Sequence, residues 1–304
     1  MTRILPVLAV LAALAPVAAH AADADQIKRG EYLFQAGGCL GCHTDTKDGA
    51  QPLAGGRAFH TPLGVFYGPN ITPDPQHGIG KWSDADFVRA LRKGVSPDGS
   101  NYFPVFPYTS FTGIADKDLI DLKAYIFSLK PVAQPNKPHD VKPPFGWRWT
   151  LFGWKLLFFT EGPTKPDPAK SPEWNRGAYL VNALGHCQEC HSDRNLLGGL
   201  DRGRHLGGSA KGPEGKPIAN ISPDKETGLG DYSEKDIAFL LRTGIKTDGD
   251  AVGGAMGEVI QNSTGKLTDA DLAAMAVYLK SIPPVRNQVG APKPAGEKKK
   301  NAWD

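Results

Sequence analysis

The chain has 304 residues, enough for two domains of ordinary size. Its 35 lysines and arginines barely outnumber its 32 aspartates and glutamates, and a net charge of +3 does not support nucleic-acid binding. A local basic run lies in a Pro/Gly/Lys-rich tail, residues 286–304, which we expect to be flexible and solvated.

Residues 1–21 are typical of a secretory signal peptide. One arginine is followed by a short apolar stretch and an Ala-His-Ala sequence that ends at Ala21. The stretch is too short for a membrane-spanning helix, and Pro6 and Pro16 interrupt it. No cysteine lies near the cleavage site, so we expect no lipid anchor there. We predict an exported, periplasmic protein that begins near Ala22.

All four cysteines lie in two copies of one Cys-x-x-Cys-His pentapeptide, formed by Cys39, Cys42 and His43 and by Cys187, Cys190 and His191. Two other uses of four cysteines are disulfides and a zinc site. A disulfide across a two-residue gap is strained, and paired zinc-binding motifs usually lie about 15–20 residues apart. Neither use explains a histidine after both pairs.

The pentapeptide is the attachment sequence for haem c. Two thiols one helical turn apart can form thioethers with the two vinyl groups of a porphyrin. The histidine that follows can then coordinate the iron. We therefore predict two covalently bound haems c, with His43 and His191 as axial iron ligands.

The two pentapeptides lie in two copies of a longer unit. "KRGEYLFQAGGCLGCH" resembles "NRGAYLVNALGHCQECH", and "NITPD" resembles "NISPD". Such self-similarity predicts a duplicated domain. The predicted organisation is a signal peptide at 1–21, a first domain at 22–132, a Pro/aromatic linker at 133–173, a second domain at 174–285 and the tail at 286–304.

Each copy carries the start and stop signals of helices. Ser83-x-x-Asp86 and its counterpart at Ser233 are typical capping boxes, and a glycine follows each helix. In the last helix Met275 lies on the apolar face and is expected in the core. Long Gly/Pro-rich loops without obvious strands connect the helices. The predicted fold class is mainly α, with two tandem helical domains.

The linker contains an aromatic segment, residues 147–159, that would be apolar nearly all round as a helix. Arg148 and Lys155 would form its narrow polar stripe. We expect this helix to be buried between the two domains. The alternative is docking of residues 145–159 onto a partner subunit or a membrane surface.

Both pentapeptides, both "NI-x-PD" loops, the capped helices and the stretch "FPVFPYTSF" resemble the class I c-type cytochromes. Within that family they resemble the tandem cytochrome subunits of periplasmic alcohol and gluconate dehydrogenases. The resemblance covers nearly the whole mature chain. It implies cytochrome c-like domains, a dehydrogenase subunit as electron donor, and a cytochrome or oxidase as acceptor.

The resemblance also implies a methionine on the far side of each iron, in a loop before the last helix. Met256 lies between the two C-terminal helices and is predicted to bind the second iron. A constant offset of 150 residues between the copies places Phe106 at the corresponding position, where relatives read "PAMPY". Phenylalanine cannot bind iron. The residues that could replace the methionine are His60, His77, Lys93, Tyr102 and Tyr108.

Of these candidates Tyr102 is favoured, because it lies close to the ligand loop. An iron with five ligands or a bound water is the equal alternative. Loss of the thioether would lower the potential of the first haem by about 0.2 V within the ~0.8 V that axial ligands span. The leading hypothesis is therefore electron transfer from the first haem to the second. The alternative is a haem enzyme, a peroxidase or an oxidant of a small sulfur compound, that uses an open first iron.

Overall fold

The computed structural model describes residues 23–212 and 215–290 of the chain. The predicted signal peptide and the end of the predicted tail lie outside these residues. Within the described ranges, no helix is both long and apolar enough to cross a membrane.

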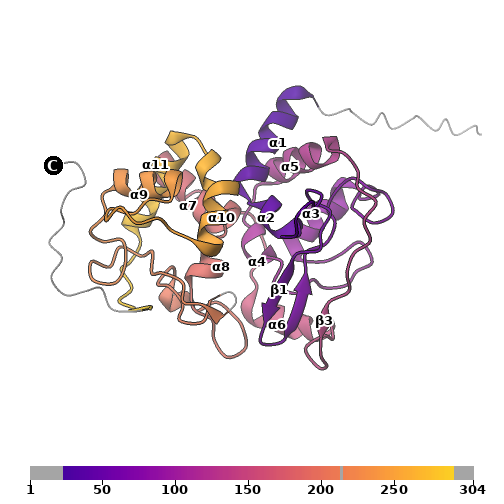
Figure 1. Ribbon diagram of the computed structural model, residues 1–304. Coiled ribbons are helices and arrows are strands. Elements are labelled where there is room, and N and C mark those ends of the chain that lie inside the picture. The colour runs from indigo at the N-terminus through magenta and orange to yellow at the C-terminus, as the bar shows by residue number, and fades with distance from the viewer. Residues whose placement is uncertain (1–22, 213–214, 291–304) are drawn as a thin grey trace, which may run out of the picture.

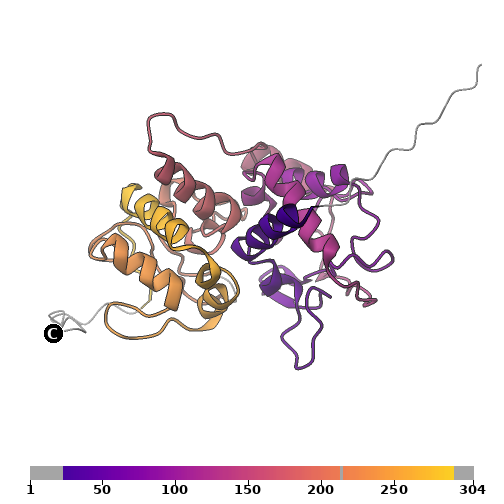
Figure 2. The same cartoon turned by 90° about the horizontal axis from the view of Figure 1, so that it is seen from above.

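The described chain is mainly helical and has two halves that lie side by side (Figures 1 and 2). Up to residue 160 the helices are α1 (Ala24–Ala36), α2 (Cys39–His43), α3 (Asp84–Lys93), α4 (Tyr108–Phe111), α5 (Asp116–Ser128) and α6 (Thr150–Phe158). Beyond it they are α7 (Pro172–Tyr179), a π-helical turn (Leu180–Leu184), α8 (Gln188–His191), α9 (Glu234–Thr243), α10 (Gly254–Asn262) and α11 (Asp269–Ser281), with short 3-10 turns at Arg202–Arg204 and Thr264–Lys266. The strands are β1 (Ala58–Thr61), β2 (Gly64–Tyr67) and β3 (Asp140–Val141).

The three strands form an antiparallel sheet in the order β1-β2-β3, so the expectation that loops alone connect the helices is wrong. Gly64 begins β2 directly after the hairpin turn, and its φ of +135° favours glycine. Phe66 anchors the hairpin against Phe103, with ring centroids 5.1 Å apart. β3 comes from the linker. A pairing between segments so far apart in the chain leaves no local pattern to read.

The predicted helix boundaries are confirmed where neighbouring side chains define them. Ser83 and Ser233 each accept a hydrogen bond from the backbone three residues ahead, and the aspartate there completes a capping box. Gly94 and Gly244 end these two helices in the left-handed region, at φ values of +60° and +77°.

In each half the first helix crosses a later one at a glycine: α1 crosses α5, and α7 crosses α11. A Cβ on Gly30 would lie 2.0 Å from the carbonyl oxygen of Asp121, and one on Gly177 would lie 1.9 Å from that of Ala274. Any larger residue would therefore push α1 from α5, or α7 from α11. These crossings set the position of the segment that follows each first helix, which carries the Cys-x-x-Cys-His motif.

The second half has one residue more than the first between its Arg-Gly pair and its first cysteine. The π-helical turn at Leu180–Leu184 falls within this longer segment. A π-helical turn accommodates one inserted residue without breaking the helix. The insertion therefore leaves both the helix crossing and the cysteine motif in place.

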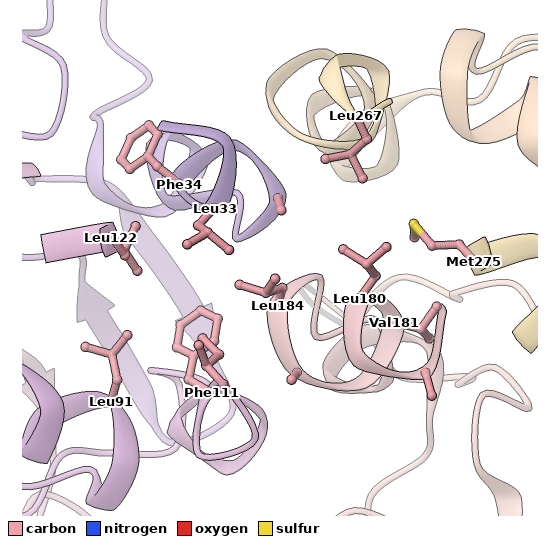
Figure 3. Close-up of a cluster of buried hydrophobic side chains, with 14 of the residues drawn as sticks. Leu33, Phe34, Leu91, Phe111, Leu122, Leu180, Val181, Leu184, Leu267 and Met275 are labelled. Carbon is pink, nitrogen blue, oxygen red and sulfur yellow. The ribbon is translucent and has the colours of Figure 1, made fainter. Parts of the chain in front are cut away.

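One hydrophobic cluster extends through both halves, and it includes the predicted core residue Met275, which is 1% exposed. Figure 3 shows its centre, where Leu33 and Phe111 of the first half face Leu180 and Leu184 of the second. The two halves thus share one continuous core.

Two tyrosines join the halves in a reciprocal manner. The Tyr32 hydroxyl of α1 donates a 2.6 Å hydrogen bond to Asp271 Oδ2 at the start of α11. The Tyr179 hydroxyl of α7 donates a 2.6 Å hydrogen bond to Asp118 Oδ2 at the start of α5. The tyrosine of α1 therefore bonds to α11, and the tyrosine of α7 bonds to α5 in the same manner.

Helix α6 begins at Thr150 and does not lie buried between the halves, so the expectation of burial is wrong. Leu151 is its one buried residue. Most of its other apolar side chains are exposed. The interface between the halves is filled instead by α1, α4 and the π-helical turn.

Candidate haem sites

The first pentapeptide forms the short helix α2, and the second lies along α8. Each begins after a residue in the left-handed region, Gly38 at φ +61° and His186 at φ +40°. This sharp turn redirects the chain after the first helix of each half. Within one helical turn, two cysteines separated by two residues lie on the same side, as attachment to one porphyrin edge requires.

The two motif histidines are held in the same way. His43 Nδ1 donates a 2.8 Å hydrogen bond to the carbonyl oxygen of Pro69, and His191 Nδ1 donates a 2.8 Å bond to that of Ala219. A metal-binding histidine commonly uses one ring nitrogen in this manner and presents the other to the metal. Both rings therefore offer Nε2 as the ligand atom.

Burial lowers the pKa of His43 and of His191, while the hydrogen bonds to Pro69 and Ala219 act in the opposite direction. The net lowering keeps both imidazoles neutral. A neutral imidazole is the form that binds a metal ion.

The two carbonyl groups are positioned by the asparagines of the "NI-x-PD" loops. Asn70 donates from Nδ2 to the carbonyl oxygen of Val132 at 2.8 Å, and its Oδ1 accepts the Thr72 N–H at 2.9 Å. Asn220 makes the same two contacts, with Val285 at 2.6 Å and Ser222 at 2.9 Å. In the sequence these loops are recognisable as repeats and as a family feature, but their contact with the histidine carbonyl partner is not. Their recurrence was the signal that could have indicated this positioning function.

The motif cysteines are unpaired thiols. Burial raises the pKa of Cys39 and of Cys187 to about 12, so both are neutral. The neutral S–H is the group that adds across a vinyl double bond when a thioether forms. No group of three or more metal-ligating side chains is found within residues 23–212 and 215–290.

The two pentapeptides lie close together. Burial raises the pKa of Cys190 to about 11, and Glu189 and then Cys42 add to the rise. The effect of Cys42 crosses from one motif to the other. Glu189, between the second pair of cysteines, also accepts 2.7 Å hydrogen bonds from Thr109 Oγ1 and Ser110 Oγ of α4.

The segments proposed to carry the sixth ligands start in the same register. The Tyr102 N–H donates to the Gly94 carbonyl oxygen at 2.8 Å, and the Val252 N–H donates to that of Gly244 at 2.8 Å. Phe106 lies four residues after the first contact, as Met256 lies after the second.

Met256 lies inside α10 and not in a loop, so that part of the prediction is wrong. It is half-buried and packs against the shared core. α10 contacts α2, and Glu258 of α10 forms a 2.7 Å ion pair with Arg57 of the first half. The helix therefore also packs across the interface, a long-range contact that stabilises helical structure after Gly253.

Most of the chain is similar in sequence to known proteins. Residues 27–130 match the family described as Cytochrome c. A dihaem c-type cytochrome of Cereibacter sphaeroides is 44% identical over 265 residues, which are 86% of this chain and 87% of that protein. The chain belongs to the cytochrome c family. The cytochrome is therefore expected to bind haem c, and the histidine and cysteine geometry above fits that group.

Other relatives of the cytochrome are dehydrogenase subunits, which confirms the resemblance seen in the sequence. The cytochrome c subunit of a quinone-dependent alcohol dehydrogenase from Gluconobacter oxydans is 43% identical over 276 residues. The gluconate 2-dehydrogenase cytochrome c subunit of Pantoea cypripedii is 39% identical over 264 residues. The matches cover 88% and 84% of the cytochrome but only 57% and 59% of these relatives. They support electron transfer by a cytochrome rather than a catalytic subunit.

The candidates for the sixth ligand in the first half of the cytochrome occupy different environments. Tyr102 contacts Phe106, with ring centroids 5.5 Å apart, and burial raises its pKa to about 12. Tyr108 is fully buried, and no partner for its hydroxyl is found among the described residues. The rings of both tyrosines therefore lie beside Phe106, and burial keeps both side chains as neutral phenols.

The other three candidates lie on other segments of the first half. His60 is exposed on β1, where it pairs with Val65 of β2. His77 lies half-buried in a turn before α3. Lys93 is exposed at the end of α3 and forms a 3.3 Å ion pair with Glu161.

Proposed function

We propose that this cytochrome binds two haems c and transfers electrons from a periplasmic dehydrogenase subunit to a downstream cytochrome or oxidase. Cys39, Cys42 and His43 would hold the first haem. The second would be held by Cys187, Cys190 and His191. The observation that carries the proposal is the matched hydrogen bond at each motif histidine, which fixes Nδ1 on a backbone carbonyl and presents Nε2.

Haem c supplies an iron that gains and loses one electron without a change in its protein ligands. The residues of this chain fix that iron in place. Each cysteine pair attaches one porphyrin edge, and each asparagine loop holds the carbonyl group that orients the histidine. Burial keeps the imidazoles neutral and reduces their contact with water.

We propose further that the chain consists of two tandem cytochrome c-like domains, at 22–132 and 174–285, joined by the linker. The glycine crossings at Gly30 and Gly177 support a duplication, because both allow a Cβ-free approach to the last helix at about the same distance. The paired capping boxes and paired asparagine contacts support it as well.

Passage of electrons between the two sites is supported by the closeness of the motifs. Cys42 contributes to the raised pKa of Cys190, which indicates that the two motifs are near each other. Side chains of α4 contact α8, while α10 contacts α2. The second motif thus lies against α4, which follows Phe106. The first motif lies against α10, which contains Met256.

The proposed direction of transfer is from the first haem to the second. Met256 would give the second iron a His/Met ligand pair, which raises the reduction potential. Phe106 supplies no ligand, so the first iron would have the lower potential. Electrons move spontaneously toward the site of higher potential.

Intact mass spectrometry of the denatured protein tests the two sites directly. We expect the polypeptide mass plus two haems. The variant Cys187→Ala/Cys190→Ala should lose one haem, and Cys39→Ala/Cys42→Ala should lose the other. A wild-type mass with one haem or none would contradict the proposal. Turnover of hydrogen peroxide or thiosulfate by the wild-type protein would favour the enzyme alternative.

A further inference from the structure

Helix α6 is oriented with its apolar side toward solvent and its cationic side toward the protein. Arg148 Nη1, just before the helix, donates a 2.7 Å hydrogen bond to the Asn101 carbonyl oxygen. Lys155 Nζ donates to the carbonyl oxygens of Lys93 and Gly94 at 2.7 and 3.0 Å. A helix on the surface of a water-soluble protein normally has the opposite orientation. The two cations therefore anchor α6 with its apolar side outward.

The outward side is formed by large apolar side chains that contact little of the protein. Leu156 is 73% exposed and Trp149 is 71% exposed. The indoles of Trp147 and Trp149 stack on each other, with ring centroids 6.1 Å apart. We call this surface the α6 patch; it consists of Phe145, Trp147, Trp149, Phe152, Leu156, Leu157, Leu196 and Leu197.

The last two members of the α6 patch come from the second half. Trp154 Nε1 of α6 donates a 2.9 Å hydrogen bond to the Leu197 carbonyl oxygen, which places the 196–197 turn beside the helix. A Cβ on Gly199 would lie 2.3 Å from the Phe158 ring, so this turn and α6 are in close contact. The patch therefore spans both halves at one end of the molecule, the lower end in Figure 1.

The segment that forms most of the α6 patch carries a small net positive charge. Residues 140–161 contain three cations, Lys142, Arg148 and Lys155, and two carboxylates, Asp140 and Glu161, at the two ends. The contacts of Arg148 and Lys155 described above are to uncharged backbone oxygens, and Lys155 also bonds the side-chain amide oxygen of Asn101 at 2.6 Å. Burial lowers the pKa of Lys155 to about 8, and the nearby Glu161 opposes this lowering. The α6 patch thus presents apolar side chains beside a segment with a small net positive charge.

We propose that the α6 patch inserts into the surface of an anionic phospholipid bilayer and holds the cytochrome there without spanning it. Tryptophan, phenylalanine and leucine on one face, with cations nearby, is the composition of helices that lie in the membrane interface. The net positive charge of residues 140–161 complements the anionic headgroups. Exposed leucines and tryptophans of this number are too many for a surface that remains in water.

The test is flotation of the haem-loaded full chain with lipid vesicles on a density gradient. Vesicles of phosphatidylcholine alone are compared with vesicles that also contain phosphatidylglycerol. We expect binding to the anionic vesicles, weaker binding to the neutral ones, and a decrease as salt is added. The variant Leu156→Glu/Leu157→Glu should weaken binding by at least about tenfold, because two exposed leucines no longer enter the lipid.

The matched control is Phe239→Glu, which alters an exposed apolar side chain on α9, outside the patch. This variant should bind the vesicles as the wild type does. All variants have the same N- and C-terminal segments, so those segments cannot account for a difference in binding. An unchanged haem spectrum shows that each variant is folded. The proposal fails if the wild-type protein does not float, or if Phe239→Glu weakens binding as much as the leucine variant. It also fails if Leu156→Glu/Leu157→Glu dissociates a lipid-free dimer or a dehydrogenase complex but floats normally.

Discussion

Replacing Phe106 with methionine should raise the potential of the first haem by about 0.2 V, a quarter of the ~0.8 V that axial ligands span. The matched backbone bonds at Tyr102 and Val252 support the proposed equivalence of position 106 and Met256. At 59 mV per decade for one electron, the change is about three decades in the reduction equilibrium, or ~4–5 kcal/mol. The effect of a thioether at this position is therefore large enough to remove the difference in reduction potential between the two haems.

The loss of packing energy from Phe106→Met should be smaller than the change in the free energy of reduction. Phe106 contacts the rings of Tyr102 and Phe111, with centroids 5.5 and 5.8 Å apart. Loss of such ring pairs costs about 0.5–1.5 kcal/mol each. Methionine is flexible and fills irregular space, so it should recover part of that packing. We therefore expect a folded variant whose changed property is its redox behaviour.

The assay is a spectroelectrochemical titration combined with carbon monoxide binding to the reduced protein. Wild-type protein should bind carbon monoxide at about one site per two haems, because Met256 protects the other iron. Phe106→Met should suppress that binding, while Phe106→Leu, which removes the ring without supplying sulfur, should retain it. Two low-spin haems in the wild type, both inert to carbon monoxide, would refute the reasoning. Tyr102, His60 and His77 would then be replaced in that order.

Three further predictions concern other parts of the molecule. Met256→Ala should lower one redox midpoint and leave the other nearly unchanged; two unchanged midpoints would remove Met256 from the ligands. Gly30→Ala should lower the free energy of unfolding by about 1–3 kcal/mol, because its Cβ would overlap a backbone oxygen of α5, whereas Gly153→Ala, with open space around its Cβ, should not, as chemical denaturation would show. Burial, and then the charge of Arg148, lowers the pKa of His139, so the unfolded chain binds more protons below its usual pKa. Stability should therefore fall as the pH decreases below about 6.5, and His139→Asn should show a smaller decrease in melting temperature.

Features defined by neighbouring residues were predictable from the sequence. The capping boxes at Ser83 and Ser233 and the glycine stops are confirmed, because a helix end is determined within a few residues. The core position of Met275 followed from helical periodicity. The family was recognisable for the same reason, since its motifs are short and contiguous.

Features that depend on long-range packing were not predictable. The small sheet requires β3, which pairs with Val65 and Gly64 from more than half a domain away. Arg148 and Lys155 orient α6 by donating hydrogen bonds to backbone oxygens of another segment. The apolar pattern of residues 147–159 contains no information about those oxygens. The carbonyl groups of Pro69 and Ala219 likewise carry no residue-type signal, because any residue supplies a backbone oxygen.

The reciprocal contacts of Tyr32 and Tyr179 have a consequence for the ancestry of the molecule. A patch that meets its own copy in this manner is the signature of a two-fold symmetric dimer of identical chains. Given the proposed duplication, the cytochrome has the form of such a homodimer joined into one polypeptide. In a homodimer every substitution occurs twice, so its two irons must remain equivalent. Fusion of the genes removes that constraint. A change at position 106 alone then gives the two sites different potentials, and so gives electron transfer between them a direction.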